Sequence, residues 1–191
     1  MRGSSDPQRG KESVMSSLSK GLAKVEVGLA WDPSGQGEPP HDLDIVAATY
    51  TTEDTSGRPE YLVHFDSRSP DGTITLNRDS KTGQGFGFDE VMTLELDRLA
   101  STYARVVIGV TIQQTSGELV FGDVGNVRVR IREDHVDLLE HGFTDIPNAR
   151  SATVAEFVRD EDDTWEMREI YQGFDADPSA FADLMGGSGS S

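Results

Sequence analysis

Most of the chain alternates short segments of β-type hydrophobic periodicity with clusters of turn residues. In residues 23–31, AKVEVGLAW, the apolar residues Val25, Val27 and Leu29 occupy every second position, so a strand would place them on one face. Gly, Pro, Asp and Ser separate the segments, and the acidic turn at 160–163 predicts a hairpin between the last two. The other predicted strands are residues 42–50, 60–65, 72–76, 90–96, 104–113, 126–132, 152–160 and 164–174.

Helical patterns are few and short. Residues 96–102 predict a connecting turn, and residues 178–185 predict a C-terminal helix that begins at proline, which the first helical turn tolerates. The consecutive apolar residues of ARVVIGVTI, 104–112, predict a central strand buried on both faces. Eight or nine short strands with so little helix predict an all-β fold, an antiparallel β-sandwich with short connecting and C-terminal helices.

A chain of 191 residues is expected to form one domain. The polar, aperiodic residues 1–14 predict a disordered leader or tag, residues 15–185 the β-sandwich domain, and the Gly- and Ser-rich residues 186–191 a flexible tail. No stretch approaches the ~20 apolar residues of a transmembrane helix. Cysteine is absent, which removes thiolate metal sites. We therefore expect a cytoplasmic protein.

The net charge of −17, from 34 acidic and 17 basic side chains, restricts the partners. Such a surface repels nucleic acids and anionic lipids, so no nucleic-acid partner is expected. The acidic excess can serve solubility alone. Alternatively, some carboxylates converge on divalent cations, which would relieve their mutual repulsion.

The segment NRDSKTGQGFGFDE, residues 77–90, has glycine at three alternate positions and ends on two adjacent carboxylates. A phosphate-binding loop is disfavoured because Asp89 and Glu90 would repel phosphate and a strand, not a helix, follows them. An EF-hand is excluded because, with Asp79 as position one, the glycine required at position six is Gln84. A calcium loop of another kind and a plain surface turn both remain.

Two more acidic turns precede this loop. Asp42 and Asp44 are two residues apart, so on a strand both side chains point to the same side and repel each other unless a cation joins them. Asp66 and Asp71 bracket a predicted turn, where ordinary turn chemistry is the favoured explanation for Asp71. Calcium sites of β-sandwiches that draw oxygens from several loops would use residues of this kind.

Signals for catalysis are weak. The four histidines lack metal-ligand spacing, and no serine occupies a GxSxG elbow. Arg128, Arg130 and Arg132 share one strand face, for which a solvated face is favoured over a site for an acidic partner. We therefore expect no enzyme, with a hydrolase that uses the acidic loops around Mg²⁺ or Mn²⁺ as the alternative.

The chain contains, in this order, the motifs LSKG (18–21), VGLAWD (27–32), DLD (42–44), SPDG (69–72), RDSKTGQGFGFDE (78–90), VVIGVTI (106–112), FGDVGNVRVRI (121–131) and EIYQGF (169–174). Together, these motifs resemble the TerD family of tellurite-resistance and stress-response proteins, in particular its actinobacterial members. The resemblance implies a β-sandwich that binds calcium at one end through acidic loops and has no firmly attached enzymatic activity. It also implies Ter-type protein partners and peripheral association with a membrane.

The resemblance also implies a set of calcium ligands. The family's long loop typically reads DNxTGEGDGDDE, and this chain has Ser80, Gln84, Phe86 and Phe88 at four of these positions. Up to three carboxylates are thus lost, which predicts weaker calcium binding. The two phenylalanines are expected either on an exposed rim or in the core. Asp32 is a further candidate ligand that can instead cap a turn. The expected ligands are Asp42, Asp44, Asp66, Asp79, Asp89 and Glu90.

The leading hypothesis is a calcium-binding stress-response module that acts through protein partners. The first alternative is the metal-dependent hydrolase. The second is a metal-free interaction domain whose acidic loops only increase solubility.

Overall fold

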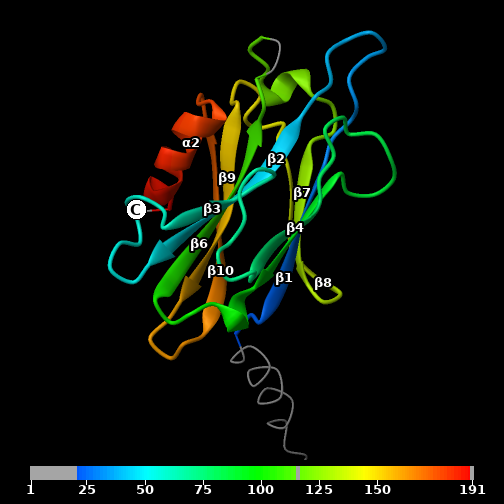
Figure 1. Cartoon of the computed structure of the whole chain (residues 1–191). Coiled ribbons are helices and arrows are strands. Elements are labelled where there is room, and N and C mark those ends of the chain that lie inside the picture. The colour runs from blue at the N-terminus through cyan, green and yellow to red at the C-terminus, as the bar shows by residue number, and fades with distance from the viewer. Residues whose placement is uncertain (1–20, 115–116, 190–191) are drawn as a thin grey trace, which may run out of the picture.

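The structure is a computed structural model that describes residues 21–114 and 117–189. Two antiparallel five-stranded sheets pack face to face, with one short helix on the outside (Figure 1). This confirms the predicted all-β sandwich. The predicted leader, residues 1–14, lies outside the described residues.

One sheet, here called the β1 sheet, has the strand order β4-β5-β1-β7-β8. β1 lies at its centre, and its inward side chains, among them Val25, Val27 and Leu29, are completely or almost completely buried. The strands are β1 (Lys24–Ala30), β4 (Ile74–Arg78), β5 (Glu90–Glu95), β7 (Arg128–Glu133) and β8 (Val136–Gly142).

The second sheet, here called the β6 sheet, has the order β10-β9-β6-β2-β3. Eight successive residues of β6 are buried, which confirms the prediction of a central strand covered on both faces. The strands are β2 (Leu43–Thr51), β3 (Tyr61–Val63), β6 (Tyr103–Ile112), β9 (Ser151–Arg159) and β10 (Trp165–Phe174).

The outer face of the β6 sheet is covered by α2 (Pro178–Leu184), followed by η4 (Met185–Gly187) (Figure 1). Phe181 of α2 packs so closely on β6 that a Cβ atom at Gly109 would lie 2.5 Å from its ring. Two further short helices, η2 (Leu96–Arg98) and η3 (Phe121–Asp123), connect strands. The predicted connecting turn and C-terminal helix are therefore confirmed.

The expectation of eight or nine strands missed β8. Its residues are mostly exposed, because β8 is an edge strand that, in residues 21–114 and 117–189, pairs only with β7. Charged residues and His141 interrupt any clean alternation in its sequence. The sequence signal for β8 was Asp134, a residue type that is common in tight turns. Asp134 forms the turn between β7 and β8 with a φ of 51°, a conformation that aspartate tolerates better than most residues.

The prediction of a flexible tail over residues 186–191 is wrong for residues 186–189. Arg105 donates hydrogen bonds to the carbonyl oxygens of Gly186 (2.7 Å) and Ser188 (2.5 Å). A Cβ atom at Gly186 would lie 2.4 Å from the carbonyl oxygen of Ser56. Glycine therefore permits close approach of the backbone here rather than flexibility.

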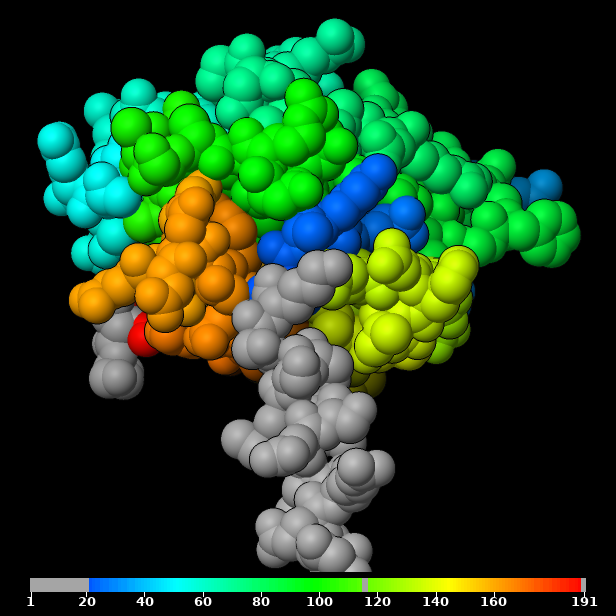
Figure 2. All heavy atoms as spheres, turned by 90° about the horizontal axis from the view of Figure 1, so that it is seen from below, coloured from blue at the N-terminus to red at the C-terminus, as the bar shows by residue number. Residues whose placement is uncertain are grey.

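The two ends of the sandwich differ in character. The loops at residues 31–42 and 79–89 lie at the upper end in Figure 1, where β2 and β5 begin. Figure 2 shows the opposite end, where the chain enters β1 beside the β7–β8 and β9–β10 turns. Within the described ranges, no helix has the length and apolar character needed to cross a membrane.

Candidate metal centre

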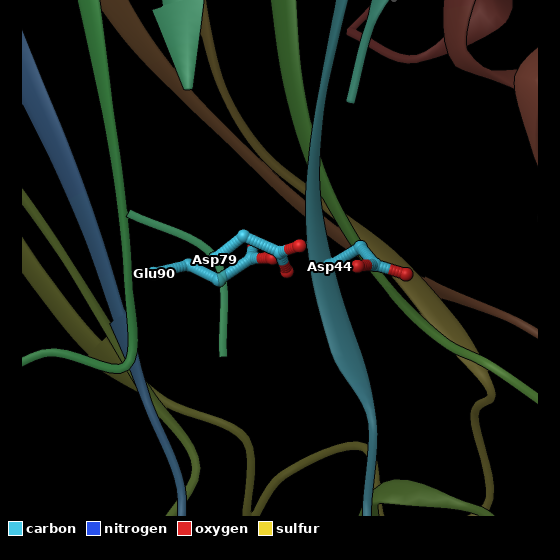
Figure 3. A group of neighbouring side chains, drawn as sticks. All are labelled: Asp44, Asp79 and Glu90. Atoms are coloured by element: carbon cyan, nitrogen blue, oxygen red, sulfur yellow. The ribbon is translucent and has the colours of Figure 1, made fainter. Parts of the chain in front are cut away.

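Three carboxylates lie close together near the starts of β2 and β5, with Asp79 and Glu90 on one side of the β2 ribbon and Asp44 on the other (Figure 3). Asp44 lies near the start of β2, Asp79 directly after β4, and Glu90 at the start of β5. One oxygen from each lies within 4.8 Å of the other two. β4 and β5 belong to the β1 sheet and β2 to the β6 sheet, so this acidic cluster bridges the two sheets.

Glu90 is completely buried. Its Oε2 accepts a hydrogen bond from the backbone N–H of Ile45 at 2.7 Å, whereas its Oε1 is buried and has no hydrogen-bond partner among the described residues. Burial first, and the nearby charges of Asp44 and Asp79 next, raise the pKa of Glu90 to about 10. Without a cation, this carboxyl group therefore holds a proton at neutral pH.

Asp44 is 2% exposed. Burial raises the pKa of Asp44 to about 6, and the charges of Asp42 and Asp79 contribute to this rise. The hydrogen bond that Gln113 Nε2 donates to Asp44 Oδ2 at 2.5 Å has the opposite effect and lowers this pKa. Gln113 was not predicted as a site residue. It directly follows β6, and no local sequence pattern marks it, because it meets Asp44 through pairing of distant strands.

Asp42 borders the cluster and is not one of its three members. Its Oδ1 is buried, and no residue in the described part of the chain hydrogen-bonds to it. Burial and the charge of Asp79 raise the pKa of Asp42, against the opposing effect of Lys81. Asp42 therefore lies close enough to interact electrostatically with the acidic cluster and with any cation bound there.

Asp89 is held differently from its neighbour Glu90. Its Oδ2 accepts a hydrogen bond from the backbone N–H of Trp31 at 2.9 Å, and the residue is buried. Asp89 is not one of the three carboxylates of the acidic cluster. Asp89 therefore ties the loop after β1 to the start of β5.

The other two candidates also lie outside the cluster. Asp66 is exposed after β3, and its backbone N–H donates to His64 Nδ1. Asp32 accepts a hydrogen bond from Asn126 Nδ2 at 2.7 Å, and its own N–H donates to the carbonyl oxygen of Gly125. Asp32 thus holds a turn, which was one of the two roles expected for it.

The cluster suits a hard divalent cation. All three ligand groups are carboxylates, which Ca²⁺ and Mg²⁺ prefer over softer donors. A buried, unpartnered carboxylate oxygen such as Glu90 Oε1 is costly unless a proton or a cation satisfies it. The residues present therefore fit an oxygen-coordinated ion.

The two phenylalanines of the glycine-rich loop lie in different environments. Phe86 is 97% exposed, whereas Phe88 packs on β1, where a Cβ atom at Gly28 would lie 2.7 Å from its ring. The guanidinium carbons of Arg130 and Arg128 lie 4.3 Å and 5.6 Å from the centroid of the Phe88 ring. The arginine face that was expected to be solvated thus covers an aromatic side chain.

Phe88→Ala is expected to lower the free energy of unfolding by about 1–2 kcal/mol, because cation–π contacts contribute ~0.5–1 kcal/mol each and ring packing is also lost. The matched variant Phe86→Ala should change it by less than about 0.5 kcal/mol, since that ring is exposed. Urea denaturation of both variants measures the difference. Equal effects would contradict the packing described for Phe88.

The free energy of unfolding of calcium-free protein is expected to fall between pH 7 and pH 9. Glu90 has an ordinary pKa of 4.5 and a folded pKa of about 10, so in this range the folded protein holds a proton that the unfolded chain has released. Linkage then lowers stability by up to ~1.4 kcal/mol per pH unit. Urea denaturation in chelator measures this slope, and Glu90→Gln should flatten it. A wild-type slope of zero would contradict the protonated state.

The TerD domain sequence model matches residues 6–184. The chain belongs to the TerD family. The match begins within residues 1–14, the stretch predicted as a leader.

Curated relatives include the tellurium resistance protein TerD of Serratia marcescens, which is 24% identical over 87% of this chain and 88% of its own length. The general stress protein 16U of Bacillus subtilis is 23% identical over 87% and 89%.

Two proteins of known structure have a higher sequence identity to this chain than these curated relatives. A TerD homologue, SCO6318 from Streptomyces coelicolor, is 53% identical, with a TM-score of 0.85 over 87% of this chain and 98% of that one. SAV2460, described as a protein of unknown function, is 55% identical, with a TM-score of 0.86 over 88% and 99%. These matches confirm the family resemblance, including its actinobacterial character.

Proposed function

We propose that this TerD-family protein is a calcium-binding stress-response module that acts in the cytoplasm through protein partners and not through catalysis. The observation that carries the proposal is the acidic cluster of Asp44, Asp79 and Glu90, with its buried and unpartnered Glu90 Oε1. The names of curated relatives, which include tellurium resistance and general stress proteins, support the stress-response part.

The bound ion would be held by these three carboxylates, with Asp42 adding negative charge at the rim. An ion there would neutralise repelling groups from both sheets, so its main effect would be to stabilise the upper end of the sandwich. Calcium is favoured over magnesium because a centre spanning separate loops suits the variable coordination of calcium better than the strict octahedron of magnesium.

Calcium is expected to raise the midpoint of thermal unfolding of chelator-treated protein. A ligand at about a hundred times its Kd stabilises the folded state by roughly 2.7 kcal/mol. Scanning calorimetry with calcium, magnesium or chelator measures the effect, and magnesium should give a smaller shift. No shift with calcium would contradict the proposal and favour the metal-free interaction domain.

The hydrolase alternative uses the same carboxylates and predicts turnover of phosphate esters or nucleotides with Mg²⁺ or Mn²⁺. A screen of such substrates with and without metal separates the two functions. Metal-dependent turnover that Glu90→Gln abolishes would replace the proposed non-catalytic role.

A further inference from the structure

A groove of about 610 Å³ lies on the outer face of the β6 sheet, between α2 and the segment that contains β3. Val46 and Thr111 from β2 and β6 line it, as do Leu62 and Phe65 from the β3 segment and Ala182 from α2. Its volume is within the range of pockets that bind small ligands or a few side chains.

The groove and the acidic cluster share Asp44. Along β2, the side chain of Ile45 belongs to the core between the sheets, whereas that of Val46 packs in the hydrophobic cluster under α2 on the outer face of the β6 sheet. Figure 3 shows the Asp44 carboxylate on the opposite side of the β2 ribbon from Asp79 and Glu90. One buried carboxylate therefore borders both sites.

The groove is negatively charged. Its lining includes Asp44, Glu60 and Asp183 but only one arginine, Arg58. Within the described part of the chain, none of the ion pairs involves Glu60 or Asp183. Burial lowers the pKa of His64, so this lining residue adds no positive charge at neutral pH.

The rim also offers apolar contact. Phe65 is 45% exposed, and Leu62 and Pro178 lie in the same lining. Aromatic side chains, phenylalanine among them, are enriched in the cores of protein–protein interfaces, so a partly exposed Phe65 in a groove that Glu60 and Asp183 also line can receive an apolar side chain of a partner. The charge of −17 on the whole chain would further attract a basic partner.

We propose that this groove docks a segment of a partner protein in which a lysine or arginine lies next to an apolar side chain. The basic group would pair with Asp44 of the groove lining, and the apolar side chain would pack against Leu62 and Phe65. This inference rests on the proposed function and identifies the partner surface. Because calcium and the basic group would use the same carboxylate, each should weaken binding of the other, and the coupling must be reciprocal.

The test titrates three blocked tripeptides, Leu-Arg-Leu, Leu-Gln-Leu and Leu-Glu-Leu, into chelator-treated protein and follows backbone amide signals by NMR. The arginine peptide should bind about tenfold or more tightly than the glutamine peptide, since it alone carries a positive charge that complements the acidic side chains of the groove. The glutamate peptide should not bind. The signals that shift should be those of residues 44–46, 58–65 and 178–183, and saturating calcium should weaken binding.

Variants separate this inference from the proposed function. Glu60→Gln and Phe65→Ala should weaken binding of the arginine peptide severalfold, because both residues line the groove. Both should leave the calcium affinity unchanged, because neither residue belongs to the acidic cluster. Asp97→Asn replaces an exposed carboxylate of η2 and should change neither the affinity for the arginine peptide nor the affinity for calcium.

Equal binding of the arginine and glutamate peptides, or equal effects of Asp97→Asn and Glu60→Gln, would overturn the docking groove even if calcium binds normally. Arginine-peptide affinity that is the same with and without calcium would overturn the coupling through Asp44.

Discussion

Glu90→Gln is expected to weaken calcium binding by about 100-fold or more, which corresponds to about 2.7 kcal/mol. The substitution removes a charge from a centre whose affinity depends on the number of charged oxygens. Glutamine keeps the shape of glutamate, and its amide oxygen can still accept the hydrogen bond from the Ile45 N–H. Calorimetric titration of both proteins measures the loss.

The same variant should be more stable than the wild type in the absence of calcium, by about 1–3 kcal/mol at pH 8. Glutamine needs no proton to remain neutral, whereas burial and nearby charges disfavour the Glu90 carboxylate. Asp66→Asn is the matched control, since this exposed carboxylate lies outside the cluster and should alter neither property. If Asp66→Asn reduces calcium affinity as much as Glu90→Gln does, the centre is not the one described.

Arg105→Ala is expected to lower the free energy of unfolding by about 3–5 kcal/mol. Arg105 pairs with Glu156 at 2.6 Å, and both side chains are less than a tenth exposed. Removing one partner of a buried pair leaves an uncompensated charge, and carbonyl oxygens of Thr55, Gly186 and Ser188 also lose their donor. Urea denaturation measures the change.

Arg150→Ala provides the comparison, because Arg150 pairs with Asp175, which is largely exposed. Its loss should lower stability by at most about 1 kcal/mol. The double variant Arg105→Met, Glu156→Leu should recover much of the stability lost in Arg105→Ala, since no unpaired charge remains. A cost for Arg105→Ala similar to that for Arg150→Ala would contradict the role assigned to the buried pair.

Hydrophobic periodicity was sufficient to predict the central strands. The alternation in β1 and the continuous apolar run of β6 follow from burial on one face and on two faces. β8 escaped prediction because an exposed edge strand needs no such pattern. The C-terminal glycines were misread because composition cannot distinguish a flexible linker from glycines that permit close backbone contact, as at Gly186.

The acidic cluster was partly accessible to sequence reasoning. The expected set contained Asp44, Asp79 and Glu90, which the fold brings together. It also contained the neighbouring Asp89, although the alternation of an extended chain predicts that Asp89 and Glu90 point apart. The contact between Gln113 and Asp44 depends on strand register between distant segments, which one sequence alone does not reveal.

The most direct test of the central claim is a calorimetric titration of chelator-treated protein with calcium, repeated in two buffers of different protonation enthalpy. The account predicts saturable binding that is stronger for calcium than for magnesium. It also predicts release of about one proton per ion at pH 8, because the cation must displace the proton held by Glu90. Absence of binding heat in both buffers, or calcium binding of unchanged affinity in Glu90→Gln, would contradict it.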